Sequence, residues 1–407
     1  MSKNIWYISK YAISPNDGNP TRQYFLSKYI AKQGYNVSLF SSKSSGIKDC
    51  KINGLSRKKN IDGINHILLN GPEINLGFSI KRILSWIIFE TILFICGIFN
   101  KPNKPDIIIV SSLSLLTIIT GYFFKLIYGA KLIFEIRDIW PLTIMELKNL
   151  SKNNPIVFIL RAIEKFGYKK ANHIVGSMPK LDEHVRNSID KKFNYTNIPM
   201  GYDPDFYKNL QKLPKEIKQK IPSDKFIVGY AGAIGTANCV DEIIESAKIV
   251  SQKQLNITFL ILGDGPLKAE LVKKSKTYEN IIFLPKINKQ FVNDFLSSCD
   301  LLLNPWQDKT IYRFGVSPNK WIDYMYSAKP IIINYNGYQS IINEAGCGEF
   351  IEANNPKLLA EKIIEYANKE KKELIKLGNN GKEYLINNLS YSILAQKYIN
   401  IFNSLHV

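Results

Sequence analysis

The residues whose types and spacing best suit chemistry lie between Arg313 and Asp323. A turn precedes a short amphipathic helix there, and it contains Gly315, Ser317, Pro318 and Asn319. Such a turn directs free backbone N–H groups and the positive end of the helix dipole toward one point, where an anion can bind. Lys320 adds a positive charge in the first helical turn, and Asp323, one turn later, can accept hydrogen bonds from a vicinal diol. A phosphate beside sugar hydroxyls is the chemistry of a nucleotide sugar; the alternative is an ordinary helix cap.

Further candidates lie where predicted strands of the first half end. The loop from Asp17 to Arg22 follows a strand at about 4–9, and in it Gly18 allows close backbone approach while Arg22 could bind a phosphate. A later strand, at 131–141, carries three charged residues at its end, Glu135, Arg137 and Asp138. Ligands of open α/β sheets bind at the carboxyl ends of strands, so we expect these residues near a ligand. The alternative is that the glycine only turns the chain and the charges only cap a loop.

Strand, glycine turn and helix alternate in both halves of the chain. A buried strand is predicted at 105–112, and the pattern restarts with strands at 226–235 and 257–266. At 407 residues the chain is too long for one usual core. We therefore predict an α/β fold of two doubly wound, Rossmann-like domains. The predicted boundaries are 1–200, 201–385, and a terminal helix at 386–407 that packs back on the first domain.

The formal charge of +19 predicts an anionic partner, since 54 Lys and Arg residues stand against 35 Asp and Glu. The cations are spread along the chain without a helix-turn-helix, zinc-finger or RNA-recognition pattern, which disfavours nucleic acid. The five cysteines are far apart, and none of the four histidines has metal-ligand spacing. We therefore expect a reducing cytoplasm and no metal site. Gly263 and Gly265 do not form the dinucleotide GxGxxG pattern, which weakens an oxidoreductase interpretation.

One apolar run, Ile83 to Phe99, raises the question of a membrane. It falls short of the ~20 residues that a spanning helix needs, and Glu90 lies near its middle. The alternatives are a core helix, an interfacial membrane contact and a spanning helix. Basic residues at both ends could bind lipid phosphates, and they are Lys81, Arg82, Lys101 and Lys104. Residues 41–60, rich in Ser, Lys and Gly, are expected to form an exposed loop.

Six motifs, in order along nearly the whole chain, resemble those of the retaining glycosyltransferases of family 4. They are DGNPTR, RDIWP, IPMGYDPDFY, VGYAGAIGTAN, LILGDGPLKAEL and SPNKWIDYMYSAKPI. The closest likeness is to the subgroup that builds bacterial O-antigen and capsule, which includes transferases of N-acetylated amino sugars. The resemblance implies the GT-B fold, with a nucleotide-sugar donor, here a UDP-sugar, on the C-terminal domain and the acceptor on the N-terminal one. It also implies retention at the anomeric carbon by front-face attack, with no cofactor and no essential metal.

Several positions depart from the family's pattern. Gly315 and Asp323 stand where the family has the two glutamates of its Glu-x7-Glu motif. Ala233 and Asn238 stand where it has the Arg and Lys that bind the diphosphate. An aspartate can still bind the ribose diol, whereas the missing positive charges must come from elsewhere. The nearest replacements are Lys320 and Arg313.

The first half departs from the pattern as well. Arg137 stands where many relatives carry histidine, Gly18 matches the first glycine of the usual pair, and Asn19 replaces the second. The predicted catalytic residues are Lys320, Arg137, Asp138 and Asp17, of which the two aspartates would help the acceptor hydroxyl. The predicted donor-binding residues are Gly18, Asn19, Arg22, Gly232, Gly235, Asn238, Gly263, Arg313, Ser317, Pro318, Asn319, Lys320 and Asp323.

The partners expected from these observations are a nucleotide-sugar donor, a polyprenyl-diphosphate-linked saccharide acceptor and an anionic membrane surface. The protein is accordingly expected in the cytoplasm, peripheral on the inner face of the cell membrane. Two alternatives remain open. Some nucleotide-sugar epimerases share the GT-B architecture, and the depleted set of phosphate ligands would also suit a noncatalytic, membrane-bound sensor or scaffold.

Overall fold

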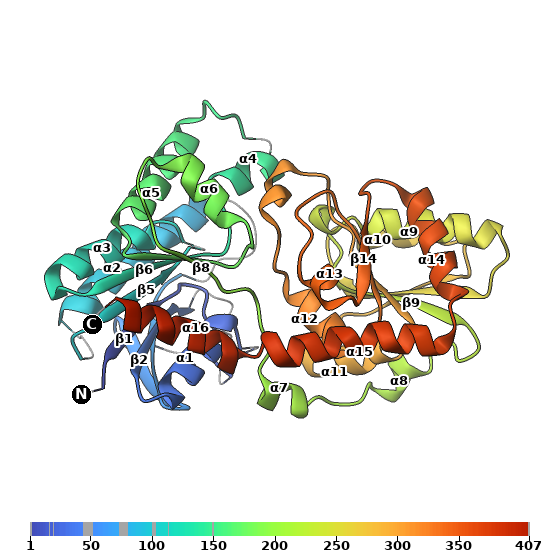
Figure 1. Ribbon diagram of the computed structural model, residues 1–407, viewed down its shortest axis with the longest axis horizontal. Coiled ribbons are helices and arrows are strands. Elements are labelled where there is room, and N and C mark those ends of the chain that lie inside the picture. The colour runs from blue at the N-terminus through green and yellow to red at the C-terminus, as the bar shows by residue number, and fades with distance from the viewer. Residues whose placement is uncertain are drawn as a thin grey trace. The chain divides into compact units, whose positions relative to one another are not determined.

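The chain forms two units, each built around its own sheet (Figure 1). Unit 1 comprises Met1–Pro199 with Tyr391–Val407, and unit 2 comprises Met200–Ser390. The computed structural model describes residues 2–15, 17–18, 20–43, 52–72, 80–99, 103–112, 114–148 and 150–405. In both units strands and helices alternate around a largely parallel sheet. The predicted fold of two doubly wound, Rossmann-like α/β domains is therefore confirmed.

The sheet of unit 1 has the strand order β3-β4-β2-β1-β5-β6-β7-β8. Its strands are β1 Asn4–Ile8, β2 Asn36–Ser42, β3 Ser56–Ile61, β4 Ile64–Leu69, β5 Ile107–Ser111, β6 Lys131–Ile136, β7 His173–Gly176 and β8 Tyr195–Asn197. Neighbouring strands run parallel except β3 and β4. Every residue of β5 is buried, as the continuous apolar run predicted for a strand that is covered on both faces.

Strand β3 corrects the expectation of a loop over residues 41–60. The part of that segment from Ser56 onward pairs with β4 as an antiparallel edge strand. The two strands are joined at Asp62 and Gly63, which both have positive φ values, 51° and 77°. Such a turn joins two strands tightly, and the charged side chains of β3 are tolerated because an edge strand faces solvent. Residues 44–51 lie outside the described ranges.

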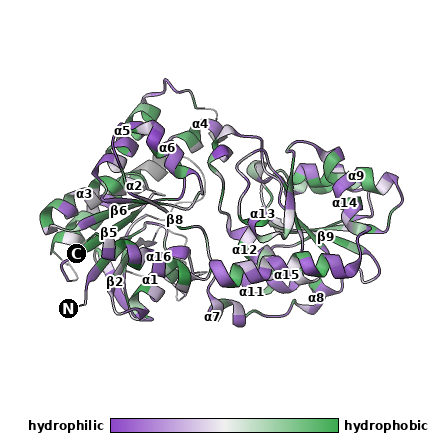
Figure 2. Ribbon diagram, viewed as in Figure 1, coloured by the Kyte–Doolittle hydropathy of each residue, from purple (hydrophilic) through white to green (hydrophobic). Residues whose placement is uncertain are grey.

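The helices of unit 1 are α1 Arg22–Lys32, α2 Ile80–Phe99, α3 Thr117–Tyr128, α4 Leu142–Lys148, α5 Pro155–Lys170, α6 Leu181–Ser188 and α16 Tyr391–Ser404. Helix α3 contacts both α2 and α5. Helix α16 packs on α1, where the rings of Phe25 and Tyr391 stack with centroids 5.1 Å apart. Figure 2 shows that α2 and α3 are largely hydrophobic.

Helix α2 presents one apolar face to the core of unit 1 and leaves other apolar side chains outside. Trp86, Phe89 and Leu93 are buried, whereas Phe99 is 79% exposed. Glu90 accepts hydrogen bonds from the hydroxyl groups of Ser114, Thr117 and Thr120, at 3.2, 2.6 and 2.7 Å. Burial nevertheless raises the pKa of Glu90 to about 7. Across the described ranges, none of the helices combines the length and apolarity that crossing a bilayer requires.

A buried polar network connects four elements of unit 1. The Arg22 guanidinium lies 3.0 Å from a Glu135 carboxylate oxygen, and Glu135 also accepts hydrogen bonds from the hydroxyls of Tyr7 (2.7 Å) and Tyr398 (2.9 Å). Arg22 donates further to the backbone carbonyls of Ile198 and Pro199. Burial alone would raise the pKa of Glu135, but Arg22 and the two tyrosines leave it below its ordinary value. The network thereby fixes α1, β1, β6 and α16 to one another.

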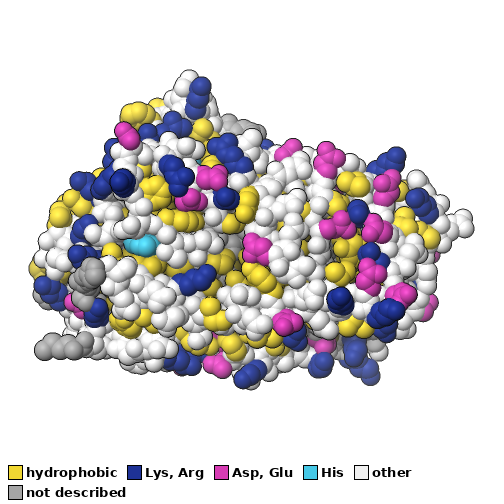
Figure 3. All heavy atoms as spheres, in the orientation of Figure 1, with side chains coloured by type: hydrophobic (Ala, Val, Ile, Leu, Met, Phe, Trp, Pro, Cys, Tyr) yellow, Lys and Arg dark blue, Asp and Glu magenta, His cyan; other side chains and the backbone are white. Residues whose placement is uncertain are grey.

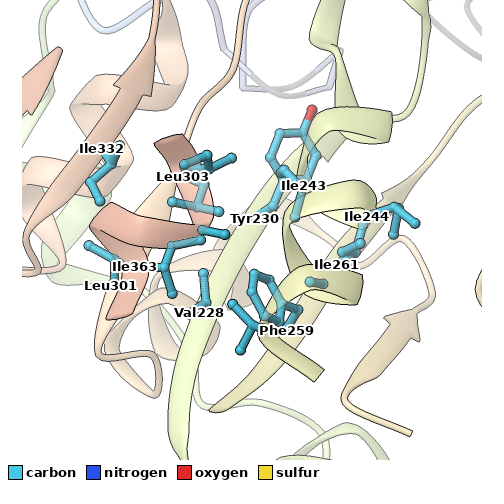
Figure 4. Close-up of a cluster of buried hydrophobic side chains, with 14 of the residues drawn as sticks. Val228, Tyr230, Ile243, Ile244, Phe259, Ile261, Leu301, Leu303, Ile332 and Ile363 are labelled. Atoms are coloured by element: carbon cyan, nitrogen blue, oxygen red, sulfur yellow. The ribbon is translucent and has the colours of Figure 1, made fainter. Parts of the chain in front are cut away.

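Unit 2 has a parallel sheet in the order β11-β10-β9-β12-β13-β14. The strands are β9 Phe226–Ala233, β10 Ile257–Asp264, β11 Ile281–Leu284, β12 Leu301–Leu303, β13 Ile331–Asn334 and β14 Gly348–Ile351. Buried aliphatic and aromatic side chains from β9, β10 and β12 pack against α9 and α14 to form its core, including Val228, Phe259, Leu301, Ile243 and Ile363 (Figure 4).

The helices of unit 2 are α7 Pro204–Lys208, α8 Lys215–Lys218, α9 Val240–Gln252, α10 Lys268–Lys274, α11 Lys289–Ser297, α12 Asn319–Tyr326, α13 Ile341–Ala345, α14 Pro356–Ala367 and α15 Lys371–Asn388. Two 3-10 turns, η2 Thr236–Asn238 and η3 Thr310–Phe314, precede α9 and α12. Both turns follow strand ends, so they bring polar residues to the carboxyl edge of the sheet.

The buried network gives a test of how α16 stabilises unit 1. Tyr398→Phe removes one hydrogen bond to a buried carboxylate and leaves the ring in place. We expect the free energy of unfolding to fall by about 1.5–3 kcal/mol, the usual worth of a hydrogen bond to a charged group. Urea denaturation measures the change. Tyr278→Phe, at a partly exposed tyrosine of unit 2, is the control. Equal stability of the two variants would show that the Tyr398 hydroxyl contributes nothing.

Candidate functional site

Lys320 lies at the carboxyl end of β9. It is the second residue of α12, and its Nζ donates hydrogen bonds to the Tyr230 hydroxyl (2.9 Å) and to Asn238 Oδ1 (2.7 Å). Nζ also lies 4.6 Å from the centroid of the Tyr230 ring. Tyr230 belongs to β9 and Asn238 to η2, so three elements meet at this ammonium group. Both hydrogen-bonding partners are neutral, which leaves the positive charge available to an anion.

Two glycines make the space in which Lys320 lies. A Cβ atom on Gly232 would lie 2.4 Å from Lys320 Cε, and one on Gly263 would lie 1.9 Å from the Gly232 carbonyl oxygen. Gly263 has a φ of +154° and pairs with Gly232 across β9 and β10. Any larger residue at either position would displace the lysine or separate the strands. We refer to Tyr230, Gly232, Asn238, Gly263 and Lys320 as the strand-end cluster.

The predicted turn before α12 is present, and its residues differ in exposure and in the hydrogen bonds they make. Gly315 has a φ of +79°, and Pro318 is the N-cap residue of α12. The Ser317 hydroxyl accepts a hydrogen bond from the Met200 backbone N–H, at 2.8 Å, so it holds the chain at the start of unit 2. Asn319 is exposed.

The other predicted donor ligands on loops of unit 2 are Arg313 and Gly235. Arg313 is exposed, and its guanidinium lies 4.6 Å from the centroid of the Phe314 ring. Gly235 precedes η2, and a Cβ atom added there would meet nothing within 4 Å. This open space is compatible with the donor binding predicted for Gly235. A role in donor binding stays a prediction for both residues.

Asp323 belongs to a different set of contacts. One oxygen accepts a hydrogen bond from the Tyr207 hydroxyl at 2.5 Å, and the other accepts one from the Lys289 ammonium group. The side chain is 12% exposed. Both oxygens are therefore engaged before any ligand arrives, and binding of a ribose would use their remaining lone pairs. Contact with ribose stays a prediction.

In unit 1, internal contacts occupy Arg22, the residue predicted to bind a phosphate. Its side chain is completely buried, and the ion pair with Glu135 occupies the guanidinium together with two backbone carbonyls. A buried carboxylate needs such a partner, and a phosphate would have to compete with it. The sequence suggested a free loop arginine because the fold that buries it brings together residues 113 positions apart.

Asp17 is also engaged inside unit 1, and its role at the acceptor hydroxyl stays a prediction. Its carboxylate accepts from the Ser14 hydroxyl (2.5 Å) and from Arg57 (2.8 Å), and it lies 3.6 Å from the His66 ring. The side chain is only 4% exposed, so the acid holds the loop in place. Neighbouring Gly18 is exposed with a φ of +149°, and Asn19 lies outside the described ranges.

Arg137 and Asp138 follow β6 at its carboxyl end, as predicted. Both are partly exposed, and the Arg137 backbone N–H donates to the Ser112 hydroxyl at 3.0 Å. Parallel β5 and β6 place Ser112 and Arg137 at the same sheet edge. Both residues therefore lie at the carboxyl edge of the sheet of unit 1, and their part in ligand binding stays a prediction.

Three functional candidates escaped the sequence analysis, namely Tyr230, Tyr207 and Lys289. Tyr230 sits within an apolar strand, where its sequence context resembles that of any core aromatic residue. Tyr207 and Lys289 meet Asp323 only because α7 and α11 converge on α12. No local pattern identifies such long-range partners. In the described ranges, the structure also brings together no group of His, Cys, Asp and Glu residues that could hold a metal ion.

Residues 212–384 match the family described as glycosyl transferases, group 1. The matched residues lie within unit 2. A poly(ribitol-phosphate) alpha-N-acetylglucosaminyltransferase of Staphylococcus aureus is 25% identical over 59% of this chain and 46% of its own length. The probable glycosyltransferase WbjE of Pseudomonas aeruginosa is 23% identical over 80% and 81%, and the capsular polysaccharide biosynthesis glycosyltransferase CapM of S. aureus is 23% identical over 61% and 65%. The matched part therefore spans less than two thirds of two of these three relatives.

Solved glycosyltransferase structures show the same fold. Sucrose-phosphate synthase from Thermosynechococcus elongatus has a TM-score of 0.76 at 15% identity, with 99% of each chain covered. HepE from Anabaena, solved in complex with UDP-glucose, has a TM-score of 0.65 at 11% identity, with 98% of this chain and 99% of HepE covered. At these identities the likeness establishes the GT-B fold class and nothing about substrates.

The ammonium group of Lys320 gives a prediction about pH. Burial lowers the pKa of Lys320 to about 8, so the free protein loses this charge as the pH rises through that value. We expect kcat/KM for the donor to fall by about tenfold per pH unit above the pKa, while kcat declines at higher pH because a bound diphosphate favours the ammonium form. Lys320→Arg, whose charge persists, should lose this alkaline limb. A limb that survives in Lys320→Arg would assign it to another group.

Asp323 gives a second prediction, which a paired comparison tests. Asp323→Asn should weaken donor binding by about 1.5–3 kcal/mol if the carboxylate binds ribose. Calorimetry measures the loss of binding free energy caused by Asp323→Asn for a ribo donor and for a 2′-deoxyribo donor. If the carboxylate binds the 2′-hydroxyl, this loss is smaller for the deoxy donor. Tyr207→Phe serves as the control, since it removes a hydrogen bond to Asp323 without changing its charge. Equal affinity of the parent for both donors would argue against a contact to the 2′-hydroxyl.

Proposed function

We propose that the protein is a retaining glycosyltransferase of family 4 that acts in bacterial surface polysaccharide synthesis. It transfers an N-acetylated amino sugar from a UDP-linked donor to a lipid-linked saccharide. The observation that carries the proposal is the position of Lys320, a half-buried cation with two neutral partners at the strand ends of a unit that matches the group 1 glycosyltransferase family. The relatives named for N-acetylglucosamine transfer and capsule synthesis support the choice of sugar and pathway.

The proposed mechanism assigns stabilisation of the leaving group to Lys320. Cleavage of a glycosyl phosphate leaves a diphosphate with growing negative charge, while the sugar becomes oxocarbenium-like. A cation fixed by Tyr230 and Asn238 is already oriented, so it needs little rearrangement as that charge develops. The backbone N–H groups at the start of α12 add to the field at the same point. Attack on the donor's front face then gives retention, and no essential metal takes part.

The acceptor is proposed to be a polyprenyl-diphosphate-linked saccharide bound by unit 1 at the inner face of the cell membrane. Arg137 and Asp138 directly follow β6 at the carboxyl edge of the sheet, which is where open α/β sheets bind ligands. We assign Asp138 to the acceptor hydroxyl and Arg137 to the donor sugar. Arg22 and Asp17 have no part in this assignment, because internal contacts occupy both.

Replacement of Lys320 tests the proposal directly. Lys320→Ala should lower kcat/KM by about 10²-fold or more, the scale of a lost transition-state charge contact. Lys248→Ala is the control, because Lys248 is a lysine of the same unit outside the strand-end cluster, where it contacts Glu245 and the Tyr278 ring. The assay uses UDP-N-acetylglucosamine, UDP-N-acetylgalactosamine or UDP-glucose with a polyprenyl-diphosphate-linked sugar, and NMR of the product reports the anomeric configuration.

Each outcome of this assay has a defined meaning. Transfer with retention, unaffected by a chelator, agrees with the proposal, whereas inversion or loss of activity on chelation contradicts its mechanism. Conversion of the donor without any acceptor would identify an epimerase. An unchanged donor after long incubation with every acceptor would favour a noncatalytic sensor or scaffold. Activity of Lys320→Ala within threefold of the parent would remove Lys320 from the site.

A further inference from the structure

The helices α2, α3 and α5 form one continuous layer on unit 1. Glycines bring them close together, since a Cβ atom on Gly97 would lie 2.3 Å from the Phe124 ring and one on Gly167 would lie 2.9 Å from Ile118. The rings of Phe94 and Phe123 join α2 to α3 with centroids 6.4 Å apart. Helices packed this tightly present a single outer face, and we call the outer surface of α2, α3 and α5 the helical face.

The helical face is unusually apolar for a surface. Its most exposed hydrophobic side chains are Phe99 (79%), Phe158 (74%), Leu126 (59%) and Ile159 (57%). Phe94 and Phe123, which touch each other between two of the helices, are themselves 40% and 49% exposed. The exposed apolar residues therefore continue from α2 to α3, and contiguous exposed apolar surface of this kind marks an interaction site.

On these three helices, the acidic side chains that the structure describes point inward and the basic ones point outward. Their two carboxylates, Glu90 and Glu164, both point inward: Glu90 accepts from three hydroxyl groups of unit 1, and Glu164 accepts from Tyr168 (2.9 Å) and lies 2.8 Å from a His184 ring nitrogen. Cations remain outside, and on α5 these are Arg161, Lys165, Lys169 and Lys170, all exposed. Figure 3 shows hydrophobic and basic side chains interleaved where α3 and α5 lie.

A cluster of lysines borders the face where α3 and α5 end. Lys125 of α3 donates to the Lys170 carbonyl at 2.9 Å, and the Lys170 ammonium lies 5.5 Å from the Tyr122 ring centroid. Burial and the neighbouring charges of Lys131, Lys191 and Lys170 lower the pKa of Lys125. Like charges gathered at one place are unfavourable in the protein alone, so an anionic partner would relieve their repulsion.

We propose that the helical face docks onto an anionic phospholipid bilayer, with its apolar side chains in the headgroup and acyl boundary and its lysines on lipid phosphates. An amphipathic surface with basic residues around an apolar centre has the composition of interfacial membrane helices, and long lysine side chains can reach headgroups while their stems cover apolar surface. Self-association through the same face would bring the lysines of two copies together, which disfavours a homodimer. The inference rests on the proposed function only in that a lipid-linked acceptor places its enzyme at a membrane.

The surface extends the sequence prediction, which rested on the net charge, the apolar run Ile83 to Phe99 and the basic residues at its two ends. That run supplies part of the face, but Trp86 is 3% exposed and belongs to the core. Exposed residues of α3 and α5 supply the rest. Docking through three helices holds unit 1 in one orientation on the bilayer, which a single helix would not.

Vesicle flotation tests the apolar component. The probe is phosphatidylcholine vesicles with about a third phosphatidylglycerol, without donor or acceptor. Phe158→Ser with Ile159→Ser should lower partitioning by about tenfold or more, and the loss should persist in high salt because apolar insertion is not screened. The matched control is Ile375→Ser with Ile386→Ser, at two exposed isoleucines of unit 2, which should bind as the parent does. Equal losses in both pairs would overturn the proposal.

Charge reversal tests the basic component on the same vesicles. Arg161→Glu with Lys165→Glu should lower partitioning by at least about 10²-fold at low salt. Lys253→Glu with Lys273→Glu changes the net charge equally at exposed lysines of unit 2 and should cause less than about a threefold loss. If pure phosphatidylcholine vesicles bind equally well, the lysines have no role. If sedimentation velocity instead shows that the helical-face variants dissociate an oligomer, the face is a protein interface and the proposal is wrong.

Lys320→Ala separates this inference from the proposed function. Its substitution lies in unit 2 and should abolish transfer while leaving vesicle binding equal to that of the parent. A parent that floats with vesicles but transfers no sugar would contradict only the proposed function. A parent that transfers sugar to a water-soluble acceptor but never floats would contradict only the docking surface.

Discussion

A positive charge that is partly shielded from water and held by neutral groups is the constraint on which the site of unit 2 depends. Such a charge is costly unless an anion approaches it, so the protein must fix it without neutralising it. Tyr230 and Asn238 do so through one oxygen atom each. The glycines of β9 and β10 provide the room, and α12 carries the lysine to the strand ends. The parallel sheet matters to this chemistry because it gathers all these parts at one edge.

Much of this arrangement could be predicted because its signals are local. The sequence alone predicted the turn from Gly315 to Asn319 and the helix behind it, and the structure places α12 accordingly. The two-domain α/β fold likewise followed from repeated strand, turn and helix patterns. The Asp62–Gly63 hairpin was an equally local signal, but the polar composition of β3 concealed it. Charged edge strands lack the alternation by which strands are usually recognised.

Pairings between distant residues could not be predicted in the same way. From the sequence, Arg22 is a loop arginine that could bind a ligand. In the folded protein it pairs with the buried carboxylate of Glu135, which lies on a strand more than a hundred residues later. Asp17 looked like a catalytic acid for the same reason, although Arg57 and His66 engage it. A sequence shows which side chains carry charge. Burial and internal pairing decide which of these charged groups can still bind a ligand. The inward turn of Glu90 and Glu164 on the helical face follows that rule too.

The last helix of the chain has a consequence for synthesis. Tyr398 completes the buried network of unit 1, yet it is made 263 residues after Glu135. While the ribosome translates unit 2, helix α16 has not yet been made. The ion pair between Arg22 and Glu135 then lacks the hydrogen bond from Tyr398, and the face of α1 that α16 covers stays exposed. Unit 2, whose segment is continuous from Met200 to Ser390, has no such dependence. The nascent chain can therefore finish its second unit before its first, and full-length product is required before the first unit acquires its final stability.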